Sequence, residues 1–298
     1  MITENAPLYL SGQTGSGKTA VALVLAKTLG PVEIINADAY QVYSGLEILT
    51  AAPTEEEKEL VPHHLFGILD CDNECDAAAF SDLARAKIAE IAQRATPLVV
   101  GGSGLYLKAI THGLAPTPPG NPELRKKLEE HSLEQLVTQY RKLDPTGAKK
   151  TNLANRRYVT RNLEICILSG RPASEIKSVW QNNQPNIHAV YLRREREDIY
   201  ARINRRTERM FEEGVVEEIA ALGELSTTAA KAIGIAEIQA LIAGEIEREA
   251  CVETIQKKTR HYAKRQATWF RREAAFQSVE VGADDEAETI AESVLSLP

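Results

Sequence analysis

Cysteine is scarce in this sequence, and its scarcity excludes a disulfide framework. The 298 residues include four cysteines, Cys71, Cys75, Cys166 and Cys251. They are too few and too scattered to staple a chain of this length. The pair in CDNEC has no second Cys or His pair at a suitable interval, so we expect reduced thiols and no zinc site.

Long apolar runs are also missing. No stretch approaches the roughly 20 apolar residues that span a membrane, and the segment MITENAPLYL has no basic region followed by an apolar run. We therefore expect a cytoplasmic protein with no membrane partner. With 43% hydrophobic and 26% charged residues, the composition is that of an ordinary globular protein.

The order of apolar and amphipathic segments predicts an α/β fold with a parallel sheet. Short apolar runs (PLYLS, VEIINA and PLVVGG) alternate with helical patterns such as TAVALVLAKTL, which is typical of βαβ units. We place the first part of this core at residues 1–115. Residues 186–276 are expected to return to the core through the strand NIHAVYLRR and then form helices. The acidic tail, residues 277–298, is expected to pack loosely.

A helical insertion, residues 116–185, is expected between the two parts of the core. The proline-rich segment APTPPGNPE predicts a domain boundary or a hinge at its start. In NPELRKKLEEH, Asn121 suits an N-cap and Pro122 the first helical position. RYVTRNLEICILSG ends at Gly170, which favours a helix C-cap.

The segment GQTGSGKT, residues 12–19, predicts a phosphate-binding loop. The spacing G-x-x-x-x-G-K-T stands between an apolar stretch and a helical pattern, which is the context that this motif requires. The first amides of the helix, its dipole and the Lys18 ammonium would converge on a phosphate chain, and the Thr19 hydroxyl would bind Mg²⁺. The residues of this loop are Gly12, Gln13, Thr14, Gly15, Ser16, Gly17, Lys18 and Thr19.

The loop alone leaves the chemistry at those phosphates open. An NTPase or kinase usually needs a second acid after a neighbouring strand, but PLVVGGSG ends in Gly101, Gly102 and Ser103. Asp38 instead follows the second strand, which places it at the same sheet edge as the phosphate loop. A carboxylate there can bind a metal, accept a proton or serve as a cap or turn residue.

Charge is distributed unevenly along the chain. The net charge of −7 argues against indiscriminate binding of polyanions. However, KKTRHYAKRQATWFRR, residues 257–272, contains seven Lys or Arg, one His and no carboxylate. This basic run indicates either a specific polyanionic partner or a solvated helix face balanced by acidic neighbours.

Several of these segments together resemble the tRNA dimethylallyltransferase family. The blocks GQTGSGKT, INADAYQVYSGLEILTAAP, VPHHL, VVGGSGLYLKAI, RINRRTERMFEEGVVEEI, AIGIAEI and TRHYAKRQATWFR occur in this order, and the resemblance extends over residues 7–272. It implies a P-loop enzyme that transfers a dimethylallyl group from dimethylallyl diphosphate to the exocyclic amine of the adenosine 3′ of the tRNA anticodon. Diphosphate would be the leaving group, so the second acid of a kinase would not be needed.

The resemblance also implies roles for individual residues. Asp38 would be the general base, and Lys18 and Arg206 would support the diphosphate. Ser103, where the family usually has Thr, would hydrogen-bond the target nucleotide or the donor. The residues implied to contact tRNA are Asp38, Ala39, Tyr40, Gln41, Ser103, Arg125, Arg157, Arg161, Lys264 and Arg265. The expected partner is the anticodon stem-loop, and the expected assembly is a monomer.

Three positions depart from the family pattern. Leu49 stands where Gly is usual, Ala52 where Lys is common, and Tyr158 where a basic residue is common. Two of these changes remove a cation, one of them near the active-site loop. The departures predict an altered donor affinity or tRNA preference.

Two other enzyme classes share part of this pattern. An adenylate isopentenyltransferase would use the same loop and base on a free adenine nucleotide. A small-molecule P-loop kinase would transfer the γ-phosphate of ATP. The helical insertion and the basic run favour a polynucleotide substrate over both, and the retained Lys18, Asp38 and Arg206 disfavour a non-enzymatic RNA-binding protein.

Overall fold

The chain forms two compact units in a computed structural model that describes residues 5–181 and 185–297. The core unit comprises Met1–Thr111 and Asn186–Pro298, and the helical unit comprises His112–Pro185. Residues 1–4, part of the N-terminal segment considered above, lie outside the described residues.

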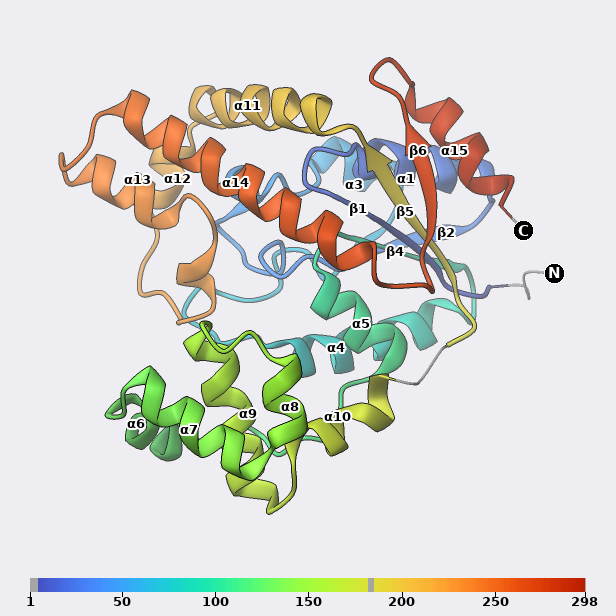
Figure 1. Cartoon of the computed structure of the whole chain (residues 1–298). Helices are drawn as coiled ribbons and strands as arrows, with labels where there is room; N and C mark the ends of the chain where they lie inside the picture. The colour runs from blue at the N-terminus through green and yellow to red at the C-terminus, as the bar shows by residue number, and fades with distance from the viewer. Residues whose placement is uncertain (1–4, 182–184, 298) are drawn as a thin grey trace. The chain divides into compact units, whose positions relative to one another are not determined.

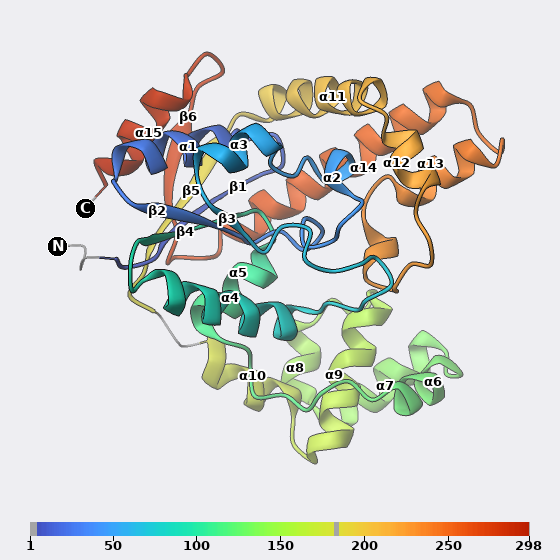
Figure 2. The ribbon, with the colours of Figure 1, turned by 180° about the vertical axis from the view of Figure 1, so that it is seen from behind.

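The core unit is built around one parallel sheet of six strands in the order β3-β2-β4-β1-β5-β6 (Figure 1; β3 is labelled in Figure 2). The strands are β1 (Leu8–Gly12), β2 (Val32–Asn36), β3 (His63–His64), β4 (Thr96–Gly101), β5 (His188–Arg194) and β6 (Gln277–Val281). The predicted α/β fold is therefore confirmed. Because β1 pairs with β4 on one side and β5 on the other, the loop that follows β1 starts inside the sheet at its carboxyl edge.

Helices cover both faces of this sheet. Those of the core unit are α1 (Lys18–Thr28), α2 (Glu47–Thr50), α3 (Glu55–Leu60), α4 (Ala77–Ile91), α5 (Gly104–His112), α11 (Arg196–Glu212), α12 (Val215–Ala220), α13 (Ile235–Ile242), α14 (Arg248–Phe270) and α15 (Ala287–Leu295), with a 3₁₀ turn at Ala229–Lys231. Figure 2 shows α1 and α15 together on one side of the sheet and α4 and α5 on the other.

The alternation of side chains along β1 explains these two layers. Leu10 is fully buried in a cluster with Leu25 of α1 and Ile290 of α15. The preceding residue, Tyr9, packs in a different cluster with Phe80 of α4 and Leu107 of α5. Successive residues of a strand point to opposite faces, so an apolar run such as LYL supplies both layers.

The expectation that residues 277–298 pack loosely is wrong for residues 277–297, and residue 298 lies outside the described residues. β6 pairs with β5 at the edge of the sheet, and α15 packs against α1. Val279, Ile290 and Val294 are at most 7% exposed. The acidic residues of this segment are exposed, and their number hides the short apolar faces that attach it to the core.

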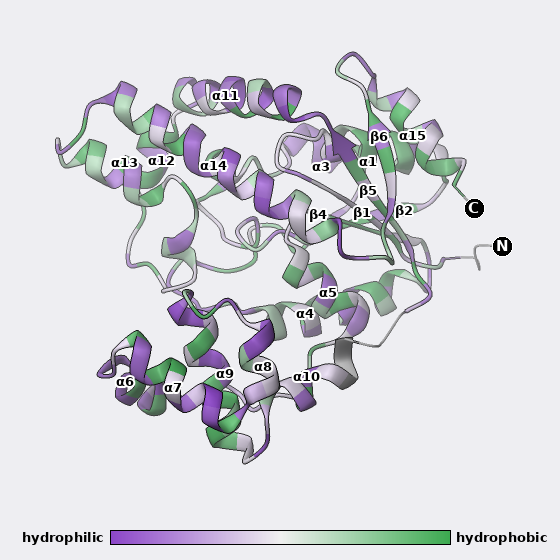
Figure 3. Ribbon diagram, in the orientation of Figure 1, coloured by the Kyte–Doolittle hydropathy of each residue, from purple (hydrophilic) through white to green (hydrophobic). Residues whose placement is uncertain are grey.

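The helical unit has a core of its own. Its helices are α6 (Pro122–Glu129), α7 (Leu133–Leu143), α8 (Pro145–Lys150), α9 (Arg156–Ser169) and α10 (Ala173–Gln181). Leu136, Tyr140, Val159 and Leu163 fill the space between α7 and α9. Hydrophobic and hydrophilic residues alternate along α7 and α9, as expected of helices with one buried face (Figure 3).

Both predicted caps of the helical unit are confirmed. The Asn121 side chain accepts a hydrogen bond from the backbone N–H of Leu124, and Pro122 is the first residue of α6. Gly170 ends α9 with a left-handed φ of 67°. Across the described parts of the chain, none of the helices combines the length and the apolar character needed to cross a membrane.

Candidate active site

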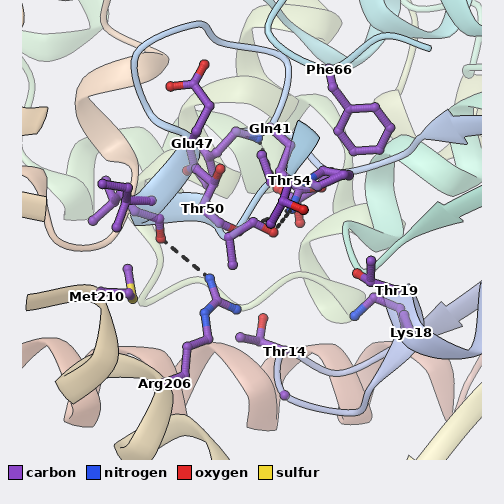
Figure 4. A pocket seen from close by; sticks show the side chains of 18 of the residues that line it. Thr14, Lys18, Thr19, Gln41, Glu47, Thr50, Thr54, Phe66, Arg206 and Met210 are labelled. Carbon is purple, nitrogen blue, oxygen red and sulfur yellow. Dashed lines mark hydrogen bonds between the residues drawn. The ribbon is translucent and has the colours of Figure 1, made fainter. Parts of the chain in front are cut away.

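A cavity of about 970 Å³ lies at the carboxyl edge of the sheet in the core unit. Its wall joins the loop after β1, the segment after β2, and parts of α2, α3, α11 and α14. Figure 4 shows Arg206 reaching into the cavity from α11, with Lys18 and Thr19 on another part of the wall. The predicted site residues on the wall are Thr14, Gly15, Gly17, Lys18, Thr19, Asp38, Tyr40, Gln41 and Arg206.

The remaining predicted residues of the core unit fall into two groups. Gln13, Ser16 and Ser103 are buried and support the wall from behind, as does the backbone of Gly12 and Ala39. Lys264 and Arg265 are exposed on α14 and do not line the cavity.

The phosphate loop has the backbone conformation that its glycines predict. Gly15 has a φ of 86°, and Gly17, the N-cap of α1, has a φ of 91°. L side chains rarely adopt such angles, so these two glycines let the chain turn directly from β1 into α1. Lys18 is the first residue of that helix, where the free amides and the helix dipole favour an anion.

Two arginines hold carbonyl groups of this loop, and one of them, Arg202, also lines the cavity. Arg202 Nε donates to the Gly15 carbonyl at 2.7 Å, and Arg194 Nε donates to the Ser16 carbonyl at 3.0 Å. Arg194 also pairs with Asp198 at 2.8 Å. Because a peptide plane is trans, the Gly17 N–H points away from the carbonyl that Arg194 holds. The two arginines therefore hold the loop in one shape.

Lys18 and Arg206 place positive charge in the cavity. Lys18 Nζ donates to the carbonyls of Gly12 and Gln13, both at 3.0 Å. Burial lowers the pKa of Lys18 to about 8, the Asp38 carboxylate opposes this shift, and Arg206 adds to it. Burial also lowers the pKa of Arg206, and Asp38 opposes that shift too. The three groups are thus electrostatically coupled across one cavity.

Asp38 is held in place by a fully buried asparagine at the end of β2. Asn36 Oδ1 accepts from the Asp38 N–H at 2.6 Å, and Asn36 Nδ2 donates to the Asp38 carbonyl at 3.1 Å. Asp38 Oδ1 accepts from the Tyr40 N–H at 3.0 Å. This arrangement fixes the carboxylate on the cavity wall, where it can accept a proton from a bound nucleophile.

Ser103 lies beside this segment. Its Oγ accepts from the Ala39 N–H at 3.2 Å and is 3.4 Å from the Tyr262 hydroxyl. Burial raises the pKa of Tyr262, so this hydroxyl keeps its proton. The serine therefore retains the hydrogen-bonding group that a threonine would offer, while Tyr262 supports it from α14.

The segment around α2 forms the opposite wall. Glu218 of α12 accepts from the N–H groups of Ile48 at 2.6 Å and Leu49 at 2.9 Å. The Leu49 carbonyl accepts from Arg206 at 3.4 Å, and its side chain is 4% exposed. Leu49, which departs from the family pattern, thus packs into the core. Ala52 lines the cavity with no cation.

Four supporting residues could not be singled out from the sequence. Arg194, Arg202, Glu218 and Gln266 each bond to a segment far away in the chain, and no local motif marks them. Arg202, Glu218 and Gln266 lie within blocks that carry the family resemblance, but position in a block does not distinguish a buried bridge from a surface residue.

The predicted RNA-contacting arginines of the helical unit differ in their surroundings. Arg125 Nε and Arg161 Nη1 both bond to the fully buried Glu164, at 3.0 Å and 2.5 Å. Arg157 is exposed, and Tyr158 beside it is 56% exposed. The tRNA contacts implied for the three arginines stay predictions.

Two aromatic residues of the basic run, Trp269 and Phe270, belong to the core, whereas Tyr262 lines the cavity. Phe270 is 4% exposed and stacks on Tyr191 with ring centroids 4.7 Å apart. Trp269 packs against Phe270 at 4.7 Å. The exposed part of α14 is therefore mostly basic, in agreement with its hydrophilic colour in Figure 3.

Comparison with known proteins places this geometry in a family. The sequence profile of a family described as IPP transferase matches residues 41–273. A tRNA dimethylallyltransferase of Akkermansia muciniphila is 42% identical over 289 residues, which is 97% of this chain and 98% of that protein. The tRNA dimethylallyltransferase 1 of Citrifermentans bemidjiense is 40% identical over 275 residues, or 89% of each chain.

Two solved structures are similar over almost the whole chain. The full-length tRNA isopentenylpyrophosphate transferase of Bacillus halodurans has a TM-score of 0.71 and 33% identity, covering 98% of this chain and 95% of that one. A eukaryotic dimethylallyltransferase acting on tRNA has a TM-score of 0.76 and 25% identity, covering 94% of this chain and 74% of that one.

Proposed function

The chain belongs to the IPP transferase family, and from this premise we propose that it is a tRNA dimethylallyltransferase. It transfers a dimethylallyl group from dimethylallyl diphosphate to the exocyclic amine of the adenosine 3′ of the anticodon and releases diphosphate. One observation carries the proposal. Lys18, Asp38 and Arg206 come from three separate segments of the chain and line the same cavity.

The phosphate loop and two cations would stabilise the leaving group. Cleavage of the allylic C–O bond develops negative charge on the bridging oxygen, so donors aimed at that oxygen lower the barrier. The backbone amides of Gly15, Gly17 and Thr19, with the Lys18 ammonium and the Arg206 guanidinium, supply such donors, whereas the Thr14 and Ser16 N–H groups are bonded within the protein. Lys18 would exchange its bonds to the Gly12 and Gln13 carbonyls for bonds to phosphate oxygens.

Asp38 would act on the other substrate. The amine of adenosine is a weak nucleophile, so a carboxylate that takes its proton during attack assists the reaction, by about 10²–10⁴-fold in rate. Ser103 accepts from the Ala39 N–H behind the cavity wall and would hold the segment that carries this carboxylate. The adenosine must leave its stack in the RNA loop to reach Asp38.

The residues around Thr19 fit a Mg²⁺ ion bound together with a diphosphate. Thr19 lines the cavity beside Lys18, and no group of three Asp, Glu, His or Cys side chains suited to a metal occurs among the residues that the structure describes. Mg²⁺ often binds through one or two protein groups, substrate phosphates and water, so one hydroxyl fits this role. When bound, the ion would neutralise charge on the diphosphate.

The exposed basic side of α14 supports an RNA partner. Lys264 and Arg265 are exposed there, and the exposed Arg157 adds a cation on the helical unit. We propose that these residues contact the phosphates of the anticodon stem-loop. We further propose a cytoplasmic monomer.

The function is tested by label transfer. Labelled dimethylallyl diphosphate is incubated with the protein and either an unmodified anticodon stem-loop, AMP or ATP. We expect label in the RNA, and a loss of at least about 10²-fold with Asp38→Asn because the base is removed. The control Asp82→Asn, at an exposed position on α4, should keep wild-type activity.

The nucleotide arms separate the alternatives. Label in AMP or ATP but not in RNA would contradict the tRNA proposal and indicate a mononucleotide acceptor. Absence of label in all three, with ATP bound and hydrolysed, would indicate a kinase-like enzyme.

A further inference from the structure

One buried side chain connects the phosphate loop with the end of β4. Gln266 of α14 is 5% exposed. Its Nε2 donates to the Gly102 carbonyl at 2.9 Å, and its Oε1 accepts from the Thr14 N–H at 2.9 Å. Both ends of the amide are used, so rotating it by 180° would place its oxygen against the Gly102 carbonyl.

The loop donates a second hydrogen bond to the same helix. Gln13 is 7% exposed, and its Nε2 donates to the Ala263 carbonyl of α14 at 3.1 Å. The phosphate loop thus donates two hydrogen bonds to α14, one from the Thr14 N–H to the Gln266 side chain and one from the Gln13 side chain to the Ala263 carbonyl. A buried amide bond is costly to break when its partner cannot reach water.

The fit around Gln266 leaves no spare room. A Cβ atom at Gly102 would lie 2.4 Å from Gln266 Nε2 and 2.8 Å from the Gly12 carbonyl oxygen. Only glycine allows this approach of α14 to the ends of β1 and β4. The packing therefore fixes the position of the amide as well as its orientation.

The two bonded segments belong to the sites of different substrates. Thr14 is part of the proposed diphosphate loop, whereas Gly102 directly precedes Ser103, which bonds to the Ala39 N–H next to Asp38. Gln266 itself does not line the cavity. It can therefore affect the reaction only through the residues that it holds.

We infer that Gln266 is a positioning residue that holds the diphosphate loop in register with the acceptor side of the cavity. The inference rests on the proposed function for the identity of the two substrates. The exposed neighbours Lys264 and Arg265 lie on the same helix, so RNA bound to them would contact the element that carries this bridge.

The test separates hydrogen bonding from packing. Gln266→Met keeps the length of the side chain but removes both hydrogen bonds. We expect kcat/KM for dimethylallyl diphosphate and the affinity for inorganic diphosphate to fall about 10- to 100-fold. Affinity for the anticodon stem-loop should stay within about twofold, because no RNA-binding group is removed.

A second variant reports on the hydrogen bonds directly. In Gln266→Glu, an ionised carboxylate accepts from the Thr14 N–H but repels the Gly102 carbonyl, whereas a protonated carboxyl group can reproduce both bonds. Burial raises the pKa of such a carboxyl group. We therefore expect its activity, divided by that of the wild type at each pH, to rise at least about fivefold from pH 8 to pH 6.

A matched control lies on the same helix. Gln256 donates to the Asn204 carbonyl at 3.5 Å and contacts neither the loop nor β4. Gln256→Met should leave kcat/KM for dimethylallyl diphosphate and the affinity for inorganic diphosphate within about twofold of the wild type. Circular dichroism shows whether each variant is folded. If Gln266→Met does not fold, the inference is tested by the change in relative activity of Gln266→Glu between pH 8 and pH 6.

Three results would overturn the inference. These are wild-type donor kcat/KM in Gln266→Met, equal losses in Gln266→Met and Gln256→Met, or a relative activity of Gln266→Glu that stays flat between pH 8 and pH 6. If the wild type transfers no label to RNA, the proposed function fails instead, and the affinity for inorganic diphosphate still tests whether Gln266 positions the loop.

Discussion

The protonation state of Lys18 makes the stability of the phosphate loop depend on pH. Its pKa is lowered from an ordinary value of 10.5 to about 8, mainly by burial. Between these two values the unfolded chain binds more protons at this position than the folded chain, so this residue makes stability rise as pH increases through that window. The site gives up some stability below pH 8 in order to hold a charged lysine in a buried place.

A bound diphosphate should reverse this shift. We predict that diphosphate binding at pH 8.5 takes up protons, because the anion restores the charged form of Lys18. The affinity for diphosphate should fall about tenfold for each pH unit above 8, once the free protein holds a neutral Lys18. Calorimetry in buffers with different ionisation enthalpies measures the proton uptake.

Lys18→Arg is the control for this prediction. Arginine remains charged over the same range, so the uptake at this position should disappear even if binding is weaker. Proton uptake of equal size in the variant would assign the titration to another group.

The sequence predicted the residues of the site that belong to local motifs. Lys18 and Thr19 were found because a phosphate loop has fixed spacing, and Asp38 because it follows a strand. Gln266 and Glu218 were not found, because each acts on backbone atoms more than 160 residues away in the chain. Such contacts depend on tertiary packing, which a single sequence does not display.

At the level of elements, α9 organises the start of the helical unit through Glu164. This carboxylate accepts from the Asn121 N–H at 2.7 Å and from Arg125 and Arg161. Burial alone would raise the pKa of Glu164, but these three donors together lower it. The charge is thereby kept in a position with no solvent exposure.

We predict that Glu164→Gln weakens the helical unit. Loss of the charge weakens the bonds to both arginines, and the expected destabilisation is about 1–3 kcal/mol. Hydrogen exchange of residues 112–181 measures this unit separately from the rest of the chain. The control Glu129→Gln, at an exposed position at the end of α6, should leave the exchange rates at their wild-type values. If Glu164→Gln exchanges no faster than this control, the prediction is contradicted.

The strength of each element's local signal decided whether it was predicted. β1, β2, β4 and β5 are apolar runs buried on both faces, and all four were expected from sequence. β6 was missed because its buried residues alternate with exposed polar ones inside an acidic segment. β3 has only two residues, too few for any periodicity.

At the scale of the whole molecule, net charge and local charge have opposite signs. The chain carries −7 overall, while residues 257–272 contain seven Lys or Arg. An acidic protein repels RNA in most orientations, so attraction is confined to its basic regions. Binding of the anticodon stem-loop should therefore depend on few cationic side chains, and the loss of any one of them should lower the affinity.

We predict that replacing both Lys264 and Arg265 with Ala lowers the salt dependence of RNA binding. Each lost phosphate contact should reduce the slope of log K against log salt by about one. Filter binding of the stem-loop measures this slope at KCl concentrations from about 50 to about 200 mM, a range that includes physiological salt. The paired change of Lys27 and Arg193 to Ala, which removes two charges elsewhere, should not alter it.

The sheet order also dictates the sequence of events during synthesis. β1 pairs with both β4 and β5, and Leu8 aligns with Leu98 on one side and His188 on the other. One edge of β1 therefore stays open until the ribosome has made β5, whereas the helical unit has its own core and is completed earlier. A nascent chain that stalls before β5 would expose the unpaired edge of β1 beside the phosphate loop, and an unpaired strand edge favours aggregation until β5 covers it.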